Sequence, residues 1–273
     1  MTRAAFQGER GAFSEDTVLR LFSDAEPLAR RSLTDVFEAV INGDADFGVV
    51  PVENSQAGSI NETYDLLLKY DLNIYGETQL AVNHCLMAPI GESLESIKTV
   101  YSHPQALAQC ESFLRTLNAE IMPSYDTAGS AKLIKERGLV NCAAVASKRV
   151  SEIYHMQILA ENIQTIPNNY TRFFIISKEK ANYAEKNKTS LVFAIKNIPG
   201  ALYDCLGALA TRGINLTKLE SRPSKDKPWE YVFYVDLEGH VDDDICSQAL
   251  QSIREKTSFL KILGSYPESV ISG

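Results

Sequence analysis

The strongest constraint on the fold is an alternation of two hydrophobic patterns between residues 4 and 177. Short apolar runs, typical of buried strands, alternate with longer stretches that carry apolar residues at helical spacing. The runs are AAFQG, DFGVVPV, NIYGETQLAV, KTVYS, CAAVAS and RFFIIS; the helical stretches are SEDTVLRLF, SLTDVFEAVINGD, PQALAQCESFLRTL, TAGSAKLIKERG and KRVSEIYHM. Alternating strands and helices predict a mostly parallel α/β sheet. Ligands of such sheets bind where the strands end at their carboxyl termini.

The pattern changes after residues 178–190, a stretch rich in Lys, Glu and Asn that we interpret as a linker. Beyond it, the expected order is strand, helix, strand, strand, helix, strand. The six segments are TSLVFAIK, PGALYDCLGALATRG, INLTKLESR, WEYVFYVDLEG, DDDICSQALQSIREKT and FLKILGSYP. This βαββαβ order is that of a ferredoxin-like domain. We place the second domain at about residues 188–268, after a first domain over residues 1–180.

Charge and composition argue against several classes of protein. The chain has 273 residues and a formal net charge of −8, which argues against a nucleic-acid partner because phosphate neutralisation needs clustered Lys and Arg. No stretch approaches the roughly 18 apolar residues of a membrane span, and the N-terminus has no signal-peptide core. The five cysteines show no CxxC pair and no ligand spacing with histidine, and His84-Cys85 is expected along a strand. We expect a reduced cytoplasmic protein without metal or membrane partners.

Polar side chains gather in four segments next to expected strand or helix ends. The segment GERGAFSE places two glycines and Ser14 at a helix start, which suits an anion, although an ordinary tight turn explains it equally. The segment VVPVENSQAGS places Glu53, Asn54 and Ser55 just past an apolar strand. A polar turn is an equally good interpretation of that segment alone.

The third segment, YSHPQALAQC, places Ser102 and His103 at the end of a strand, before a helix that begins at Pro104. The free N–H groups of that helix start would point to the same place. Gln109 lies about one and a half turns into the helix, where it would face either the site or solvent. His103 has the residue type of a general base, but no Ser/His/Asp spacing supports that role, so we favour capping or packing.

The fourth segment, NNYTRFF, stands at the start of a buried strand. Thr171 offers one hydroxyl, and Arg172 offers a planar fork that matches a carboxylate. A surface position or a structural ion pair is the competing interpretation of Arg172.

The four segments together resemble the prephenate dehydratase family. Its signatures stand here as Gly8-Gly11-Ser14, Pro51-Glu53-Asn54-Ser55-Gly58, Tyr101 to Cys110, and Asn169-Thr171-Arg172-Phe173, in family order. The resemblance implies two α/β lobes that face each other across a cleft, as in type II periplasmic binding proteins. One lobe would comprise residues 1–77 and 168–177, and the other residues 78–167.

The resemblance implies a carbon–oxygen lyase that converts prephenate to phenylpyruvate in L-phenylalanine biosynthesis, with no metal or organic cofactor. Thr171 would be the catalytic hydroxyl, and Asn54, Ser102 and Gln109 would hydrogen-bond the substrate or the leaving group. The expected substrate-binding residues are Glu53, Ser55, Gly11, Ser14, Arg172 and Phe173. Departures from the family pattern at Glu9-Arg10, Ala12 and His155 leave arogenate open as the substrate. A non-catalytic two-lobed binding or sensor protein is the alternative from a different class.

The second domain resembles an ACT domain in two segments, Gly200-Ala201-Leu202 and Glu220-Ser221-Arg222-Pro223. Independently of that resemblance, Pro199 starts a helix and Gly200 lets a carboxylate approach its free N–H groups, while Asn215 could take an ammonium group. A helix start and a strand end without ligand are the competing interpretation. The resemblance implies that phenylalanine binds at a contact between ACT domains in a homodimer or homotetramer.

Overall fold

The computed structural model describes residues 1–224 and 231–269, which form two compact units. Unit 1 comprises Met1–Leu66 and Thr78–Phe173, and unit 2 comprises Leu67–Glu77 together with residues 174–269. Two strands, β5 (Asn73–Ala81) and β11 (Tyr170–Ser177), contribute residues to both units. None of the described helices is long and apolar enough to cross a membrane.

The first sheet has the strand order β2-β1-β3-β11-β5, with the short β4 paired to β3. Strand β1 is parallel to both β2 and β3, so the carboxyl ends of these three strands lie at one edge of the sheet. Besides β5 and β11, its strands are β1 (Arg3–Gln7), β2 (Glu26–Arg30), β3 (Phe47–Asn54) and β4 (Gly58–Ser59). The helices between them are α1 (Phe13–Leu21), α2 (Leu33–Asn42) and α3 (Asn61–Lys69).

The second sheet has the order β10-β6-β9-β7-β8 and is mixed. Strand β7 is parallel to β8 and β9, whereas β6 is antiparallel to β9 and β10. Its strands are β6 (Cys85–Ala88), β7 (Thr99–Ser102), β8 (Glu120–Pro123), β9 (Cys142–Ala146) and β10 (Gln157–Ala160). Its helices are α4 (Pro104–Gln109), α5 (Glu111–Leu114), α6 (Thr127–Arg137) and α7 (Lys148–Tyr154).

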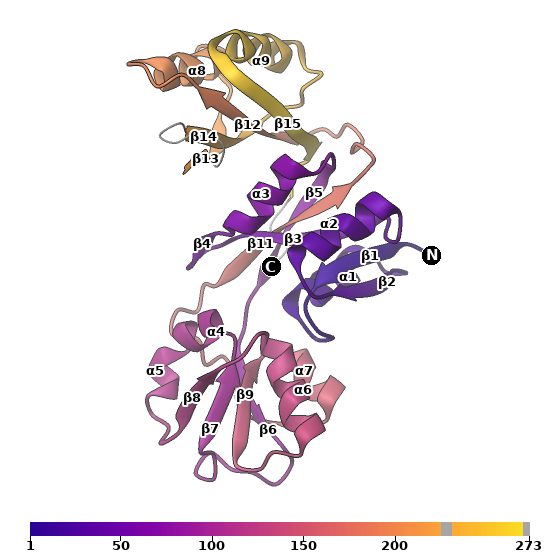
Figure 1. Cartoon of the computed structure of the whole chain (residues 1–273), viewed down its shortest axis with the longest axis vertical. Helices are drawn as coiled ribbons and strands as arrows, with labels where there is room; N and C mark the ends of the chain where they lie inside the picture. Colours follow the sequence, from indigo (N-terminus) through magenta and orange to yellow (C-terminus); the bar gives the residue numbers. More distant parts are fainter. Residues whose placement is uncertain (225–230, 270–273) are drawn as a thin grey trace. The chain divides into compact units, whose positions relative to one another are not determined.

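Strand β9 explains why helices cover both faces of this second sheet. Successive side chains of a strand point to opposite faces. Ala143 and Val145 pack with α4 and α5, while Ala144 and Ala146 pack with α6 and α7. All four side chains are fully buried. Figure 1 shows the two helix pairs on opposite sides of the strands. A five-residue apolar strand can be buried in this way only between two helical layers.

The chain crosses between the two sheets twice. It leaves β5 for β6 over residues 82–84, and it returns from β10 to β11 over residues 161–169. The crossings are hydrogen-bonded to each other, since Val82 N donates to Asn169 O at 2.7 Å and Ile163 N donates to His84 O at 3.0 Å. The two sheets are the two lobes that the family resemblance implied.

The C-terminal sheet has the order β13-β14-β12-β15, and both of its helices lie on one face (Figure 1). The chain order, β12-α8-β13-β14-α9-β15, confirms the predicted βαββαβ arrangement. The elements are β12 (Asn187–Ile195), α8 (Ala201–Ala210), β13 (Leu216–Pro223), β14 (Tyr231–Glu238), α9 (Asp244–Lys256) and β15 (Thr257–Pro267).

Within unit 2, strand β15 packs closely against α3 and β5. Lys261 Nζ donates to the carbonyl oxygens of Leu67 and Tyr70, each at 2.9 Å, and so caps the end of α3. A Cβ atom at Gly264 would lie 2.3 Å from the carbonyl oxygen of Ile74, so this position needs glycine. The C-terminal sheet and the segment 67–77 therefore share one packed interior.

The prediction of strands and helices is confirmed for the six strand runs of the first domain, and it is wrong in three respects. The stretch PQALAQCESFLRTL forms two short helices, α4 and α5, separated at Cys110. Six elements were missed: β2, β4, α3, β6, β8 and β10. The single mostly parallel sheet that alternation suggested is two sheets, because the crossings at 82–84 and 161–169 carry the chain between them.

Replacing Lys188 with methionine is expected to destabilise unit 2. Lys188 Nζ lies 2.8 Å from Glu77 Oε1, and the Glu77 side chain is only 2% exposed. Removing one partner of a buried ion pair leaves the other charge uncompensated, at a cost of about 3–5 kcal/mol. The free energy of unfolding, measured by urea titration, should fall by about that amount. Lys148→Met is the control, because its pair with Glu161 is exposed and worth less than about 1 kcal/mol. Equal losses for the two variants would contradict this account.

Candidate active site

Side chains far apart in the sequence meet where β3 ends and β11 begins. Asn54 Nδ2 donates to Thr171 Oγ1 at 3.1 Å and to Asn169 Oδ1 at 2.8 Å. Gln109 Nε2 donates to Asn54 Oδ1 at 3.2 Å, and Asn169 Nδ2 donates to Gln109 Oε1 at 3.1 Å. The structure thus brings together three of the four predicted catalytic side chains, those of Thr171, Asn54 and Gln109.

The backbone fixes the orientation of the Asn54 carboxamide. The N–H groups of Gln56 and Ala57 donate to Asn54 Oδ1 at 3.1 and 3.0 Å, and Asn54 Nδ2 donates to the carbonyl oxygen of Tyr170 at 3.2 Å. Asn54 is only 4% exposed. Because its amide must donate toward Thr171, Thr171 Oγ1 acts as an acceptor there, and the threonine O–H can be directed at a further acceptor.

Ser102, the fourth predicted catalytic residue, has a different environment. It is fully buried at the end of β7, and its Oγ donates to the carbonyl oxygen of Val145 at 2.6 Å. No hydrogen bond among the described residues joins Ser102 to Thr171 or Asn54. The neighbouring His103 accepts from Gln105 N at 3.2 Å and caps α4, as the capping interpretation predicted.

The four predicted substrate-binding residues around β3 and β11 all contact other parts of the protein. Ser55 N donates to the carbonyl oxygen of Tyr170 at 2.9 Å, and Tyr170 N donates to Ser55 Oγ at 3.0 Å, which ties the loop after β3 to β11. Arg172 lies 3.9 Å from Glu53, so the ion-pair interpretation of Arg172 fits the structure. Phe173 packs in the core of the first sheet and is 1% exposed.

The glycine-rich turn before α1 holds the two lobes together. Gly11 has a φ of 90°, and a Cβ atom there would lie 2.7 Å from Val150 Cγ2. Gly11 N donates to Glu15 Oε2 at 2.7 Å, and the carbonyl oxygen of Gly11 accepts from Ser147 Oγ at 3.0 Å. This glycine is therefore needed for the close approach of the turn to α7.

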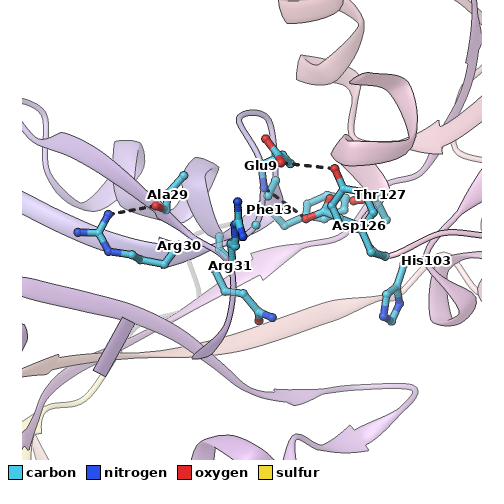
Figure 2. A pocket seen from close by; sticks show the side chains of 13 residues that line it. Glu9, Phe13, Ala29, Arg30, Arg31, His103, Asp126 and Thr127 are labelled. Atoms are coloured by element: carbon cyan, nitrogen blue, oxygen red, sulfur yellow. Dashed lines mark hydrogen bonds between the residues drawn. The ribbon is translucent and has the colours of Figure 1, made fainter. Parts of the chain in front are cut away.

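A cavity of about 660 Å³ opens beside the carboxyl ends of β1 and β2 (Figure 2). This volume is in the usual range for small-molecule sites, about 300–1,000 Å³. Figure 2 shows Arg30 and Arg31 on one side of the cavity, and Asp126, Thr127 and His103 on the other. The lining residues are Gln7, Gly8, Glu9, Ala12, Phe13, Ser14, Ala29, Arg30, Arg31, His103, Tyr125, Asp126 and Thr127.

The charge balance of this cavity suits an anion. Glu9 pairs with Lys132 at 2.9 Å, and the Asp126 carboxylate accepts from the N–H groups of Ala128 and Gly129 at 2.7 and 3.2 Å. Both carboxylates are thus compensated by neighbouring groups. The start of α1 at Ala12 has no side-chain cap, so its first N–H groups can receive an anion.

The cavity and the Thr171 network lie along the same edge of the first sheet. Gln7 on β1 is paired in register with Arg30 on β2, and β3 and β11 follow in the strand order. Phe6 on β1 is paired in register with Val49 on β3, so Asn54 and its partner Thr171 lie several residues beyond the end of β1 along the strand direction. Among the described residues, Thr171 and Asn54 do not line the cavity itself.

Several of these residues were not predicted from the sequence. Arg30 ends β2 and Arg31 follows it, a strand whose pattern was not recognised, and Tyr125 and Asp126 follow the equally unrecognised β8. A pair of arginines directly before the capping residue Ser32 was the available signal.

A second, smaller cavity of about 290 Å³ lies at the start of α8 in the C-terminal sheet. Gly200, Ala201 and Leu202 line it, and Gly200 caps the helix with a φ of 84° and no side-chain cap. Asn215 lines a separate cavity of about 520 Å³, and its Nδ2 donates to Glu238 Oε1 at 2.9 Å. Within one chain, therefore, Asn215 does not face the cavity at Gly200.

The other predicted regulatory residues lie along the edge strand β13. Glu220 forms an ion pair with Lys218 at 3.2 Å, and Ser221 is exposed. Arg222 lies next to Ser221 on the same strand and is partly exposed. None of the three lines the cavity at Gly200 in the described part of the chain.

Two family models match the chain: one described as prephenate dehydratase over residues 4–181, and one described as ACT domain over residues 189–255. The chain is 42% identical to arogenate dehydratase/prephenate dehydratase 2, chloroplastic, of Arabidopsis thaliana over 97% of this chain and 72% of that protein.

Two solved structures are similar along nearly the whole chain, each with a TM-score of 0.89. One is a prephenate dehydratase from Arthrobacter aurescens in complex with L-Phe, 29% identical over 99% of this chain and 93% of that chain. The other is GqqA, described as a novel type of quorum quenching acylase, 33% identical over 98% of both chains.

Proposed function

The chain belongs to the prephenate dehydratase family, and from this premise we propose that it converts prephenate to phenylpyruvate at the edge where β3 and β11 meet. The observation that carries the proposal is the hydrogen bond from Asn54 to Thr171, at the same edge of the first sheet as a cavity that suits an anion. It is a lyase with an ACT domain, and the reaction is a step of phenylalanine biosynthesis.

The reaction removes two groups from one ring. The bond from C1 to the ring carboxylate breaks and its electron pair enters the ring, while the C4–O bond breaks and the hydroxyl leaves as water after taking one proton. The products are phenylpyruvate, CO2 and water, and aromatisation supplies most of the driving force. The protein therefore has to hold a dianion and deliver one proton to the leaving oxygen.

Thr171 is placed to serve the leaving oxygen. Since Oγ1 accepts from Asn54, its O–H can donate to the substrate hydroxyl and relay a proton. A threonine is a weak acid in water, so its contribution depends on close positioning. Asn54 and Gln109 hold that geometry from the protein side.

The substrate carboxylates would lie in the cavity, near Arg30, Arg31 and the start of α1. Guanidinium groups bind carboxylates with paired hydrogen bonds, and the uncapped N–H groups of α1 add a second attraction. Loss of CO2 is favoured if the ring carboxylate is poorly solvated. Because Glu9 is already paired with Lys132, Arg30 and Arg31 are more available to a ligand than the Glu9 carboxylate is. This favours prephenate over arogenate, which carries an additional ammonium group.

The direct test supplies the purified protein with prephenate and arogenate in separate reactions and follows phenylpyruvate and phenylalanine. We expect phenylpyruvate from prephenate with the higher kcat/KM. Faster turnover of arogenate would show that arogenate is the preferred substrate of the same type of reaction. Turnover of neither would overturn the proposal in favour of a binding protein.

Replacing Arg31 with glutamine is expected to raise KM for prephenate by about tenfold, because a charge-assisted hydrogen bond to a carboxylate is worth about 1.5–3 kcal/mol. Steady-state kinetics measure the effect. Arg115→Gln is the control, since Arg115 is an exposed arginine paired with Glu111 and does not line the cavity. An unchanged KM in Arg31→Gln would remove this residue from the substrate site.

We also propose that L-phenylalanine inhibits the reaction by binding at the start of α8. The uncapped helix end at Gly200 suits the amino-acid carboxylate, and the cavity is partly apolar, lined by Leu202 and Phe233. The ligand must bind one arrangement of the protein better than another, or it cannot inhibit.

Two finer expectations accompany this function. We propose a homodimer or homotetramer, supported by exposed apolar side chains on the C-terminal domain, including Ile198, Tyr203, Leu219 and Phe259. Sedimentation analysis tests it, and a monomer would contradict it.

We propose a cytoplasmic location because all five cysteines are free thiols, as a reducing compartment allows.

A further inference from the structure

His84 is the buried histidine of the crossing between the two sheets. It follows β5, directly precedes β6 and is only 2% exposed. Its Nε2 lies 2.9 Å from Gln109 Oε1, and its ring packs edge-on against Phe13, with centroids 5.6 Å apart. Phe13 in turn lines the anion-binding cavity. His84 therefore contacts both the hydrogen-bond network of Thr171 and the wall of the cavity.

The network determines which nitrogen of His84 carries the proton. Backbone groups fix Asn54, so its Nδ2 donates to Asn169 Oδ1, and the amide of Asn169 must then donate to Gln109 Oε1. The same Gln109 oxygen faces His84 Nε2, which must therefore carry a hydrogen and donate it. The orientation of each group follows from the previous one, beginning at the main chain.

The other ring nitrogen confirms that this assignment is self-consistent. His84 Nδ1 is buried and has no hydrogen-bond partner among the described residues. Burial lowers the pKa of His84, so the ring stays neutral near pH 7. A neutral ring with hydrogen on Nε2 leaves Nδ1 as a bare acceptor, which costs less in an apolar site than a buried donor and charge.

From this arrangement we infer that His84 is a positioning residue for the dehydration, acting through Gln109 and Asn54 on Thr171. The inference rests on the proposed function. With the Nε2–H donor in place, Gln109 keeps its oxygen toward His84 and Asn169 and its amide toward Asn54. A turned Gln109 amide would set two acceptor oxygens against each other at Asn54 and two donors against each other at Asn169. His84 thus stabilises the Gln109 orientation that Asn54 and Asn169 require, and so supports the network around the catalytic threonine without touching the substrate.

If His84 only filled space between the two crossings, its replacement would have different effects from those of a lost positioning residue. It would lower stability and the yield of folded protein, but it would leave kcat per folded molecule unchanged. The crossings supply a matched control, because the backbone N–H of His84 donates to Gln164 Oε1 at 3.0 Å. Gln164→Ala disturbs the same segment without touching the imidazole.

The experiment compares kcat and KM for prephenate in His84→Leu, His84→Gln, His84→Asn and Gln164→Ala. Glutamine can present an N–H near the position of Nε2, whereas asparagine presents its amide near Nδ1. We expect kcat about tenfold lower in the Leu and Asn variants, with KM changed less than about threefold. The kcat of the His84→Gln variant should lie within about threefold of that of the unaltered protein. The kcat of Gln164→Ala should equal that of the unaltered protein.

Nitrogen NMR of the imidazole supplies a readout independent of turnover. The unaltered protein should show the neutral tautomer with hydrogen on Nε2. The opposite tautomer, normal kcat in His84→Leu, or equal loss in the Gln and Leu variants would overturn the inference. If His84→Leu does not fold, the comparison of kcat between His84→Asn and His84→Gln provides the test. Absence of turnover in the unaltered protein would instead overturn the proposed function, and this inference with it.

Discussion

Replacing Thr171 with valine is expected to lower kcat for prephenate by about 100- to 10,000-fold, the usual contribution of a positioned proton donor. Valine has nearly the shape of threonine but offers no hydroxyl to the leaving oxygen. Asn54 Nδ2, which now donates to Thr171 Oγ1 at 3.1 Å, keeps its bonds to Asn169 and Tyr170 in the variant. The network should therefore survive the substitution, and the loss should lie in kcat.

The kinetic distinction is the control for this prediction. KM for prephenate should change by less than about threefold, because the carboxylates are bound elsewhere, near Arg30 and Arg31. Thr171→Ser retains a hydroxyl and should keep most of the activity. Near-normal turnover by Thr171→Val would remove Thr171 from the mechanism. A large rise in KM with unchanged kcat would make it a binding residue instead.

The second large effect is expected in the C-terminal domain. Replacing Ala201 with glutamate should raise the phenylalanine concentration for half-inhibition by at least about 100-fold, because the new carboxylate occupies the start of α8 and repels that of the ligand. Activity without phenylalanine should stay unchanged. The measurement is phenylpyruvate formation against phenylalanine concentration, with direct binding followed by calorimetry.

A matched charge change separates this local effect from the added charge itself. Gln251→Glu adds one negative charge on α9, at an exposed position outside the cavity of Gly200. It should respond to phenylalanine as the unaltered protein does. Full inhibition of Ala201→Glu would place the phenylalanine site elsewhere, and an unaltered protein that ignores phenylalanine would refute the regulatory proposal.

Removing the C-terminal domain would be a less informative test than a point substitution, because β15 packs against the rest of unit 2. Lys261 and Gly264 of β15 contact α3 and β5 within unit 2. A chain cut after residue 180 would expose that packed face, so its loss of activity would not distinguish a missing sensor from a destabilised core. Point substitutions at the start of α8 are therefore the sharper test.

The degree of burial explains some of the strands that were predicted and some that were missed. The run RFFIIS reads as a strand because its apolar residues are nearly all buried in the structure. Strand β8 (Glu120–Pro123) is exposed along its whole length, and β2 (Glu26–Arg30) begins and ends with a charged residue and contains a proline. Such edge strands depend on their neighbours rather than on their own pattern, so periodicity misses them.

The site was predictable only as a set of residue types at strand ends. The bonds from Asn54 to Thr171 and from Gln109 to Asn54 join positions 117 and 55 residues apart. No local pattern reports such contacts, nor that the Ser102 hydroxyl turns toward Val145. The importance of His84 was equally hidden, because it depends on an orientation passed along side chains from the backbone around Asn54.

A crystal structure with a substrate analogue would test the placement of Thr171 against the leaving oxygen. The analogue keeps both carboxylates and the ring hydroxyl but has a saturated ring and cannot lose CO2. We expect the ring hydroxyl within about 3 Å of Thr171 Oγ1 and the carboxylates facing Arg30, Arg31 and the start of α1. An analogue whose hydroxyl points away from Thr171, or one bound apart from this edge of the first sheet, would contradict the central claim.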